Sequence, residues 1–221
     1  MKNIIAIIIL VVSTFAKTWS QECTTMWPYI YPEFMQGTLY MADKTELNAQ
    51  FNVHVKEGRL HYLSNGKIME TLSENIVLVK IGDDLYMCVE GRVMKVIGSE
   101  ERGFVATLIL GDFDQLFNSG GAYGSSSSSS STKKLIGIEI GGVTIVNYME
   151  LRQRLDQGQS IPLKYKYYIV TKGKVYPATK RDINAQLNET ESAEFRLFLK
   201  NHKIKWKDAN SLLTLLDYFN K

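Results

Sequence analysis

The stretch FNVHVKEGRLHYLSNG, residues 51–66, decides the fold of this chain. Apolar and polar residues alternate between positions 51 and 56, which is the period-two pattern of a half-buried strand. Asn65-Gly66 predicts a tight hairpin, because both residues accept positive φ at low cost. Glu57-Gly58 predicts a second two-residue turn one strand earlier. The stretch therefore predicts consecutive antiparallel strands.

The same pattern continues outward on both sides. Between Gln36 and Leu110, short apolar strands are separated by turn signals, among them Gly82-Asp83-Asp84 and Glu90-Gly91. Strands joined this closely must be antiparallel, since a parallel crossover needs a dozen or more residues. We expect an N-terminal antiparallel β-meander, either an open sheet or a small barrel.

The C-terminal part has a mixed pattern. Four segments are strand-like, namely Leu135–Ile140, Val143–Tyr148, Leu163–Thr171 and Lys174–Pro177. The last two are predicted to form a hairpin turned by Lys172-Gly173. Helical patterns follow at Arg181–Leu187, at Thr190–Asn201 and in a last helix with Asp208 as its N-cap. The predicted fold class is α+β, with two or three helices at the C-terminal end.

Composition divides the chain into four parts. We predict a signal peptide at 1–20, a β-rich domain at 21–117, a Gly/Ser-rich flexible linker at 118–132 and an α+β region at 133–221. The linker contains an unbroken serine run, Ser125–Ser131, which offers no side chains to bury. Whether the two regions on either side of it pack together is left open by the sequence.

The first 20 residues have the layout of a secretory signal peptide. Lys2 precedes the apolar run Ile4–Val12, and small and polar residues follow. The run is too short to span a bilayer, which needs about 20 apolar residues, and no longer run follows. Cleavage is expected after Ser20 or, alternatively, after Ala16. We therefore predict an exported protein that is periplasmic, outer-membrane-associated or secreted.

Composition excludes several classes of function. The 221 residues have a formal charge of +3, with 2 Cys and 3 His. This charge is too small to indicate a nucleic-acid partner, and two cysteines cannot supply a four-thiolate metal site. The sequence lacks the nucleophile-elbow, zinc-protease and phosphate-loop motifs. We predict no cofactor, and the sequence favours a protein that is not an enzyme without deciding the point.

Two histidines and a glutamate give the best candidate for a chemical site. If Glu57-Gly58 and Asn65-Gly66 are both two-residue loops, His54 lies opposite His61 and His61 lies opposite Glu70. This row could bind a divalent transition metal or act as a pH-sensitive patch. The alternative is an ordinary solvent-exposed sheet, because the row shares its face with other polar residues. A one-residue change in either loop would remove the alignment.

The two cysteines, Cys23 and Cys88, allow one disulfide. In an oxidising compartment it would tie the new N-terminus to the sheet. Alternatively, Cys88 is a buried thiol in an apolar strand, and only geometry decides between the two. Cys23 does not follow the apolar run directly, so we do not expect lipid modification.

Four aromatic residues lie close to the mature N-terminus: Trp27, Tyr29, Tyr31 and Phe34. They could stack on sugar rings. We expect instead that they fix the terminal segment over an open end of the sheet, since aromatic side chains bury large apolar areas.

Charge separates the two halves of the chain. Residues 21–118 carry 8 basic and 14 acidic side chains, and residues 133–221 carry 16 and 9. The densest basic part is Lys200, Lys203, Lys205 and Lys207 around Trp206. It could be a surface for an anionic glycan, a lipid headgroup or another partner. The favoured alternative is that the two halves face each other, or that these lysines solvate a helix end, where the macrodipole attracts cations.

Several motifs together resemble a family of uncharacterised exported proteins of Bacteroidetes-type Gram-negative bacteria. The motifs are Gln21-Glu22-Cys23, the linker start at 120–125, Met149-Glu150-Leu151, Ile161-Pro162-Leu163, Lys166-Tyr167-Tyr168, Gly173-Lys174-Val175, Phe198–Asn201 and Lys203–Lys207. The resemblance covers most of the mature chain and implies an exported, periplasmic location. It implies no activity and no site residue.

The first functional hypothesis is therefore an exported, non-enzymatic binding module or cell-envelope accessory with a protein or glycan partner. The alternative is a hydrolase of envelope or dietary polymers acting through carboxylates, for which Asp112 and Asp114 at a strand end are one starting point. A third hypothesis is a metal or pH sensor at His54 and His61.

Overall fold

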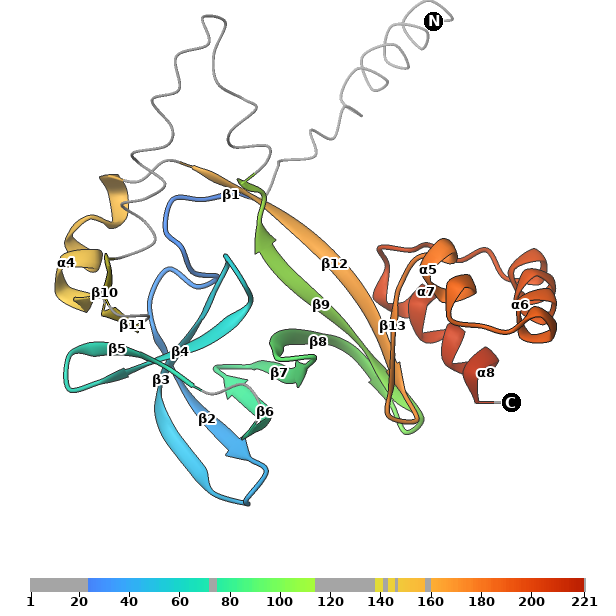
Figure 1. The fold of residues 1–221 in the computed structure, drawn as a ribbon, viewed down its shortest axis with the longest axis horizontal. Coiled ribbons are helices and arrows are strands. Elements are labelled where there is room, and N and C mark those ends of the chain that lie inside the picture. The colour runs from blue at the N-terminus through green and yellow to red at the C-terminus, as the bar shows by residue number, and fades with distance from the viewer. Residues whose placement is uncertain are drawn as a thin grey trace, which may run out of the picture.

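The computed structural model describes residues 24–71, 75–113, 138–140, 143–145, 147–157 and 160–220. Figure 1 shows a large antiparallel sheet with helices at both ends, an α+β fold that contains β-meanders, as the sequence predicts. The predicted signal peptide, the predicted linker at 118–132 and Cys23 lie outside the described residues.

Eleven strands of the described chain join in one sheet with antiparallel pairing throughout. They are β1 (Thr24–Thr25), β2 (Met35–Met41), β3 (Glu46–His54), β4 (Arg59–Ser64), β5 (Lys67–Glu70), β6 (Ile76–Ile81), β7 (Asp84–Val89), β8 (Arg92–Glu100), β9 (Gly103–Gly111), β12 (Ile161–Thr171) and β13 (Lys174–Pro177). Their order is β1-β12-β9-β8-β7-β6-β2-β3-β4-β5, and β13 also pairs with β12. Two short strands, β10 (Ile138–Ile140) and β11 (Val143–Ile145), pair separately.

Three predicted two-residue turns are confirmed. Asn65-Gly66 joins β4 to β5, Glu90-Gly91 joins β7 to β8, and Lys172-Gly173 joins β12 to β13. All six residues have φ between 49° and 74°, the conformation that the twist of a hairpin favours. The predicted two-residue turn at Glu57-Gly58 is wrong, because four residues, 55–58, separate the last pair of β3 and β4.

This four-residue loop closes the sheet onto itself. β8 and β9 stop pairing before their outer ends, and the loop enters the gap between them. The Val55 carbonyl accepts a hydrogen bond from the Gly111 amide, and the Gly58 carbonyl accepts one from the Val93 amide, each at 2.8 Å. Gly58 has a φ of +70°, and a Cβ there would lie 2.7 Å from a Leu108 methyl carbon. Docking of the loop therefore requires glycine at position 58. This docking also explains why the loop has four residues instead of two.

Strands β2, β3, β4, β6, β7 and β8 curl around an apolar core, and we call them the curled region. The buried side chains of this core are Leu39, Phe51, Val53, Leu60, Ile76, Val79, Ile81, Tyr86 and Val93. They come from alternate positions of strands that are neighbours in the sheet, which is the pattern that the sequence shows between residues 51 and 56.

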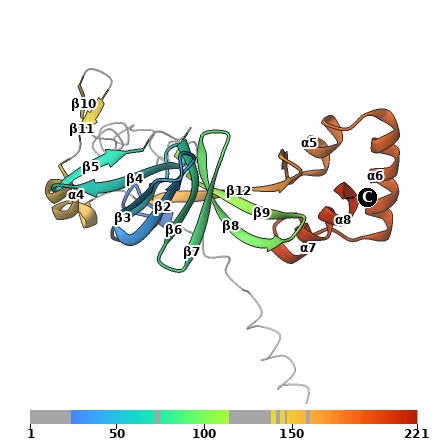
Figure 2. The same ribbon diagram turned by 90° about the horizontal axis from the view of Figure 1, so that it is seen from below.

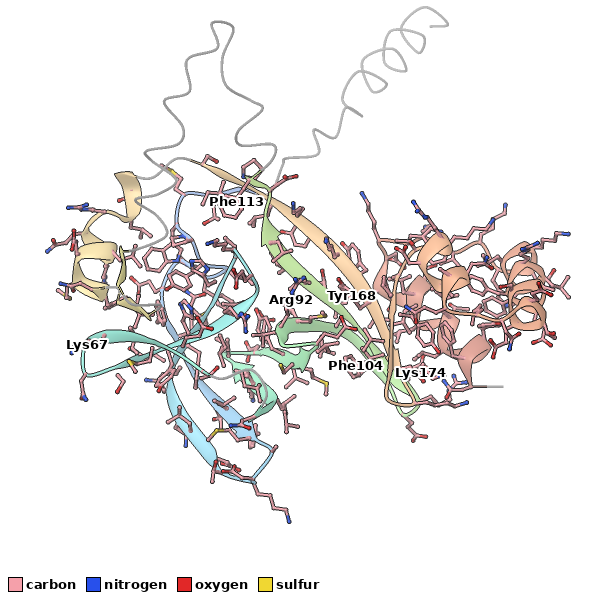
Figure 3. All side chains as sticks on the ribbon, viewed as in Figure 1. Lys67, Arg92, Phe104, Phe113, Tyr168 and Lys174 are labelled. Carbon is pink, nitrogen blue, oxygen red and sulfur yellow. The ribbon has the colours of Figure 1, made fainter. Side chains whose placement is uncertain are left out.

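The two regions predicted on either side of the linker share one sheet. β12 pairs with β9 from Leu163 opposite Gly111 to Val170 opposite Phe104. The question that the sequence left open is therefore answered by direct strand pairing. On one face of these strands, buried Met94, Ala106 and Leu108 pack with half-buried Phe104 and Tyr168, the two of these residues that Figure 3 labels.

Short helices complete the fold. They are α4 (Tyr148–Gln153), the 3₁₀ turn η2 (Leu155–Gln157), α5 (Lys180–Ala185), α6 (Glu189–Asn201), α7 (Ala209–Leu213) and α8 (Leu215–Phe219). α6 begins with a capping box of Asn188 and Glu191, and Asp208 caps α7 as predicted. The predicted last helix is divided at Thr214, whose hydroxyl lies 3.5 Å from the Asn210 carbonyl, a contact that bends helices.

Helices α5 to α8 gather at one end of the long strands, as Figure 2 shows. They cover Val105 of β9 and Ile169 of β12, and we call this part the helical region. Its core also contains buried residues from the helices: Ile183, Phe195, Phe198, Leu212, Leu215, Leu216 and Tyr218. The strand predicted at Val143–Tyr148 ends earlier, at Ile145, because Asn147 caps α4.

Candidate functional site

The N-terminal segment, residues 27–34, lies over the outer face of β3, β4 and β5. The Ile30 amide donates to the Val53 carbonyl at 3.0 Å, and the Val55 amide donates to the Pro28 carbonyl at 2.9 Å. Trp27, Tyr29 and Phe34 are buried and pack with Ile68, Leu63 and residues of α4 and η2. The expectation that aromatic residues fix this segment is confirmed for these three, although they cover a face of the sheet rather than its end.

Asn52 anchors this segment. Its side chain is fully buried. The amide nitrogen donates to the carbonyls of Tyr31 and Glu33 at 2.9 and 3.1 Å, and the amide oxygen accepts from the backbone of Tyr31 and Val53 at 3.1 and 2.9 Å. Without this side chain, the backbone groups of Tyr31, Glu33 and Val53 that it contacts would lose these hydrogen bonds.

The structure brings His54, His61 and Glu70 together, in a register different from the predicted one. His61 lies opposite Glu70, as predicted. Asn52, not His54, lies opposite His61, because the preceding loop has four residues. His54 is the diagonal neighbour on the same face, and the two imidazoles stack with their centroids 5.2 Å apart.

Tyr29 connects to this row and covers it. Its hydroxyl lies 2.9 Å from Nδ1 of His61, and Nε2 of His61 lies 3.4 Å from Glu70. Burial raises the pKa of Tyr29, and the hydrogen bond to His61 lowers the pKa of Glu70. Burial, followed by the positive charges at His61 and Lys56, lowers the pKa of His54 to about 3. The expected solvent-exposed sheet is therefore wrong for His54 and His61, whereas the Glu70 side chain is 53% exposed.

These contacts bear on the metal and pH hypotheses. Both ring nitrogens of His61 already have protein partners. Within the part of the chain that the structure describes, no group of three or more His, Cys, Asp or Glu side chains is placed to hold a metal ion. His54 stays neutral down to acidic pH because its pKa is so low. His54 and His61 are best interpreted as the polar attachment of the N-terminal segment, with Glu70 as an exposed partner of His61.

A second polar cluster was not predicted. The Tyr31 hydroxyl donates to Asp84 at 2.6 Å and lies 2.6 Å from the Tyr86 hydroxyl, and Lys95 forms a 2.7 Å ion pair with Asp84. Burial and the neighbouring Asp84 raise the pKa of Tyr31 and of Tyr86. Burial alone would raise the pKa of Asp84, but hydrogen bonds from Lys95 and Tyr31 outweigh it and the net pKa is lowered.

Part of this cluster has a sequence signal. The Glu90-Gly91 turn places Tyr86 opposite Lys95, as the structure confirms. The contribution of Tyr31 has no such signal, because it comes from an irregular segment that is 55 residues away from Tyr86 along the chain.

The basic residues of the predicted surface lie at the end of α6 and in the loop before α7. Lys200, Lys203, Lys205 and Lys207 are exposed, whereas Trp206 is half-buried against the helical core. No ion pair is formed by these four lysines within the described residues.

Other candidates have less to offer chemically. Cys88 is half-buried, and burial raises the pKa of its thiol; its predicted partner Cys23 lies outside the described residues, so the disulfide stays a prediction. Asp112 forms an ion pair with Lys164 at 3.6 Å, and Asp114 also lies outside the described residues. An open surface hollow of about 320 Å³ on the curled region is lined by Gln36, Gly37, Thr38, Asn48, Lys80 and Gly82.

None of the helices in the described chain is long and apolar enough to cross a bilayer. Comparisons with known protein families, curated proteins and solved structures find no match to this chain.

Proposed function

We propose that this chain is an exported, non-enzymatic binding protein of the cell envelope, and that its helical region binds an anionic polysaccharide. Export rests on the signal-peptide layout of residues 1–20 and on the resemblance described above. The binding role rests on the arrangement of the lysines at 200–207, which we call the lysine surface: Lys200, Lys203, Lys205 and Lys207.

The alternating burial of residues 203–207 carries the proposal. Ile204 and Trp206 pack against the core of the helical region, and the lysines between and beside them are exposed. The apolar side chains thus hold the segment in place while successive lysines face the solvent. Because the backbone of the segment is already ordered, binding of an extended anion needs to order only the lysine side chains.

The helix macrodipole explains only part of the lysine surface. Lys200 lies in the last turn of α6, where a cation is stabilised. Lys205 and Lys207 precede α7, which begins after its N-cap Asp208. A helix N-terminus carries partial positive charge and disfavours nearby cations. The interpretation of all four lysines as solvation of a helix end therefore does not extend to Lys205 and Lys207.

A polysaccharide fits this surface better than a membrane does. Segments that bind bilayers turn their Trp and apolar side chains outward, into the interface. Here Trp206 and Ile204 face the protein core. Leu197 of α6, 60% exposed, is the large apolar side chain that α5 to α8 leave open to solvent. Carboxylate or sulfate groups repeated along a sugar chain would match the exposed lysines.

The test uses the mature protein and polygalacturonate, with fully methyl-esterified polygalacturonate as the uncharged control polymer. The variant replaces all four residues of the lysine surface by Gln. We expect calorimetric titration to give about tenfold weaker binding to polygalacturonate, because each of the four exposed charge pairs contributes on the order of 0.2–1 kcal/mol and a tenfold change corresponds to about 1.4 kcal/mol.

A matched variant distinguishes the effect of where the lysines lie from the effect of net charge. It replaces Lys44, Lys56, Lys67 and Lys80, which are exposed on the curled region and its edge, by Gln. Binding should be weakened much less by this variant, although the net charge falls equally. Equal losses in the two variants, equal binding to the esterified polymer, or a preference for phosphatidylglycerol vesicles would contradict the proposal.

A further inference from the structure

Four side chains form a line across four neighbouring strands. Tyr86 of β7 lies opposite Lys95 of β8, Lys95 lies opposite Thr107 of β9, and Thr107 lies opposite Tyr167 of β12. Directly opposite residues of an antiparallel sheet point to the same face, with Cβ atoms about 5 Å apart. We call these four residues the transverse row.

The transverse row runs between the two cores of the molecule. Tyr86 belongs to the core of the curled region, and Tyr167 packs against the core of the helical region. Two register positions toward the helices, on the same face, Val105 lies opposite Ile169, and both are fully buried. The transverse row is therefore a set of polar side chains located where the long strands pass from one core to the other.

One end of the row is charged and reachable by solvent. Lys95 and Asp84 form their ion pair with about a third of each side chain exposed, 31% and 30%. Asp84 also accepts from Tyr31, whose hydroxyl in turn lies beside that of Tyr86. This end offers one cationic donor, one anionic acceptor and hydroxyl groups that are already oriented by their neighbours.

The middle of the row holds an unpaired polar atom. The Thr107 hydroxyl is buried and has no hydrogen-bond partner, and no other buried side-chain oxygen or nitrogen of the described residues is in this state. Thr107 is only 5% exposed. An unpaired buried hydroxyl is unfavourable, and valine would fill the same space without it. A group that binds at this position would explain the threonine.

We propose that the transverse row, together with Asp84 and Tyr31, binds a single sugar unit. Lys95 and Asp84 would donate to and accept from neighbouring sugar hydroxyls, and the Thr107 hydroxyl would pair with a third. Because Lys95 and Asp84 cancel each other's charge, a neutral ligand with mixed donors and acceptors fits better than an ion. Tyr165, 38% exposed and two residues from Tyr167 along β12, adds an aromatic ring beside the row.

This site is independent of the lysine surface, because it uses other residues and requires no charge on the ligand. The probes are N-acetylglucosamine, galactose and mannose, each measured with the mature protein by saturation-transfer NMR, which detects weak binding. At least one sugar should give a signal with the wild-type protein. Thr107→Val should reduce that signal at least fivefold while leaving the melting temperature unchanged or higher.

Two further variants make the result decisive. Lys95→Met should also reduce the signal, whereas Thr38→Val, at the surface hollow on the curled region, should leave it unchanged. Absence of any signal in the wild-type protein, a full signal in Thr107→Val, or a loss confined to Thr38→Val would overturn the proposal. A lower melting temperature of Thr107→Val with unchanged binding would assign the hydroxyl a structural role instead.

Discussion

The attachment of the N-terminal segment to the curled region and the lysine surface of the helical region use their polar side chains in opposite ways. On the outer face of β3 and β4, Asn52 and His61 are covered by the N-terminal segment and bond to Tyr29 or to the backbone. In the helical region, apolar Ile204 and Trp206 are turned inward and the lysines around them face solvent. Around Asn52, polar groups that satisfy one another hold the N-terminal segment in place, whereas the cations of the lysine surface remain available to a ligand. Each prediction below tests this division.

The largest effect is expected from loss of the hydrogen bonds that the Asn52 side chain makes. Asn52→Ala removes a fully buried side chain that makes four hydrogen bonds and leaves backbone groups of the N-terminal segment unpaired. We expect the free energy of unfolding, measured in urea, to fall by about 3 kcal/mol. Asn48→Ala, at an exposed position of β3, is the control and should change it by less than about 0.5 kcal/mol. Similar small losses for both variants would show that Asn52 is no anchor.

Acid should weaken the curled region through His54. The pKa of this imidazole is about 3 in the folded protein, against about 6.5 in an unfolded chain. Between these values the unfolded chain binds a proton that the folded chain does not, so stability rises with pH across this window. The group contributes about 3 kcal/mol at pH 7 that is lost by pH 4.

The measurement compares urea unfolding at pH 7 and pH 4. His54→Gln should lose less stability than the wild-type protein over this range, by roughly the amount assigned to the group. His202→Gln, at an exposed position at the end of α6, should behave as the wild-type protein does. If His54→Gln loses as much stability between pH 7 and pH 4 as the wild-type protein does, the titrating group is a different residue.

The smallest effect is expected at the lysine surface. Lys205→Gln with Lys207→Gln removes two cations that precede the N-terminus of α7. The free energy of unfolding should rise by about 0.3–0.5 kcal/mol, because the macrodipole disfavours cations there. Polygalacturonate binding should weaken in the same variant. A loss of stability would mean that these lysines support the fold rather than a ligand.

Much of the sheet could be predicted because its turns are short and local. Asn65-Gly66, Glu90-Gly91 and Lys172-Gly173 fix the register of their hairpins by their own backbone preferences. Glu57-Gly58 looks the same in sequence, yet the loop docks between β8 and β9, a contact with residues far along the chain. Tertiary contacts therefore override local turn preference at this one hairpin.

The candidate site, like the sheet, was predictable where it depends on local turns and not where it depends on contacts between distant parts of the chain. His61 opposite Glu70 follows from a local turn and is confirmed. The burial of His54 is not local, because it depends on Tyr29 crossing over the strand from the N-terminal segment. Tyr31 joins Asp84 across an even larger separation of 53 residues along the chain. The transverse row likewise needs β12 to pair with β9, which no pattern within either region indicates.

The most direct test of this division titrates polygalacturonate into two variants of the mature protein side by side, at a temperature where both are folded. One variant is Asn52→Ala and the other replaces the four residues of the lysine surface by Gln. We predict that the first keeps wild-type affinity despite its lower stability, and that the second loses affinity with its stability intact and with a weaker dependence on salt. Affinity lost in the first variant and kept in the second would contradict the division of roles between the two regions.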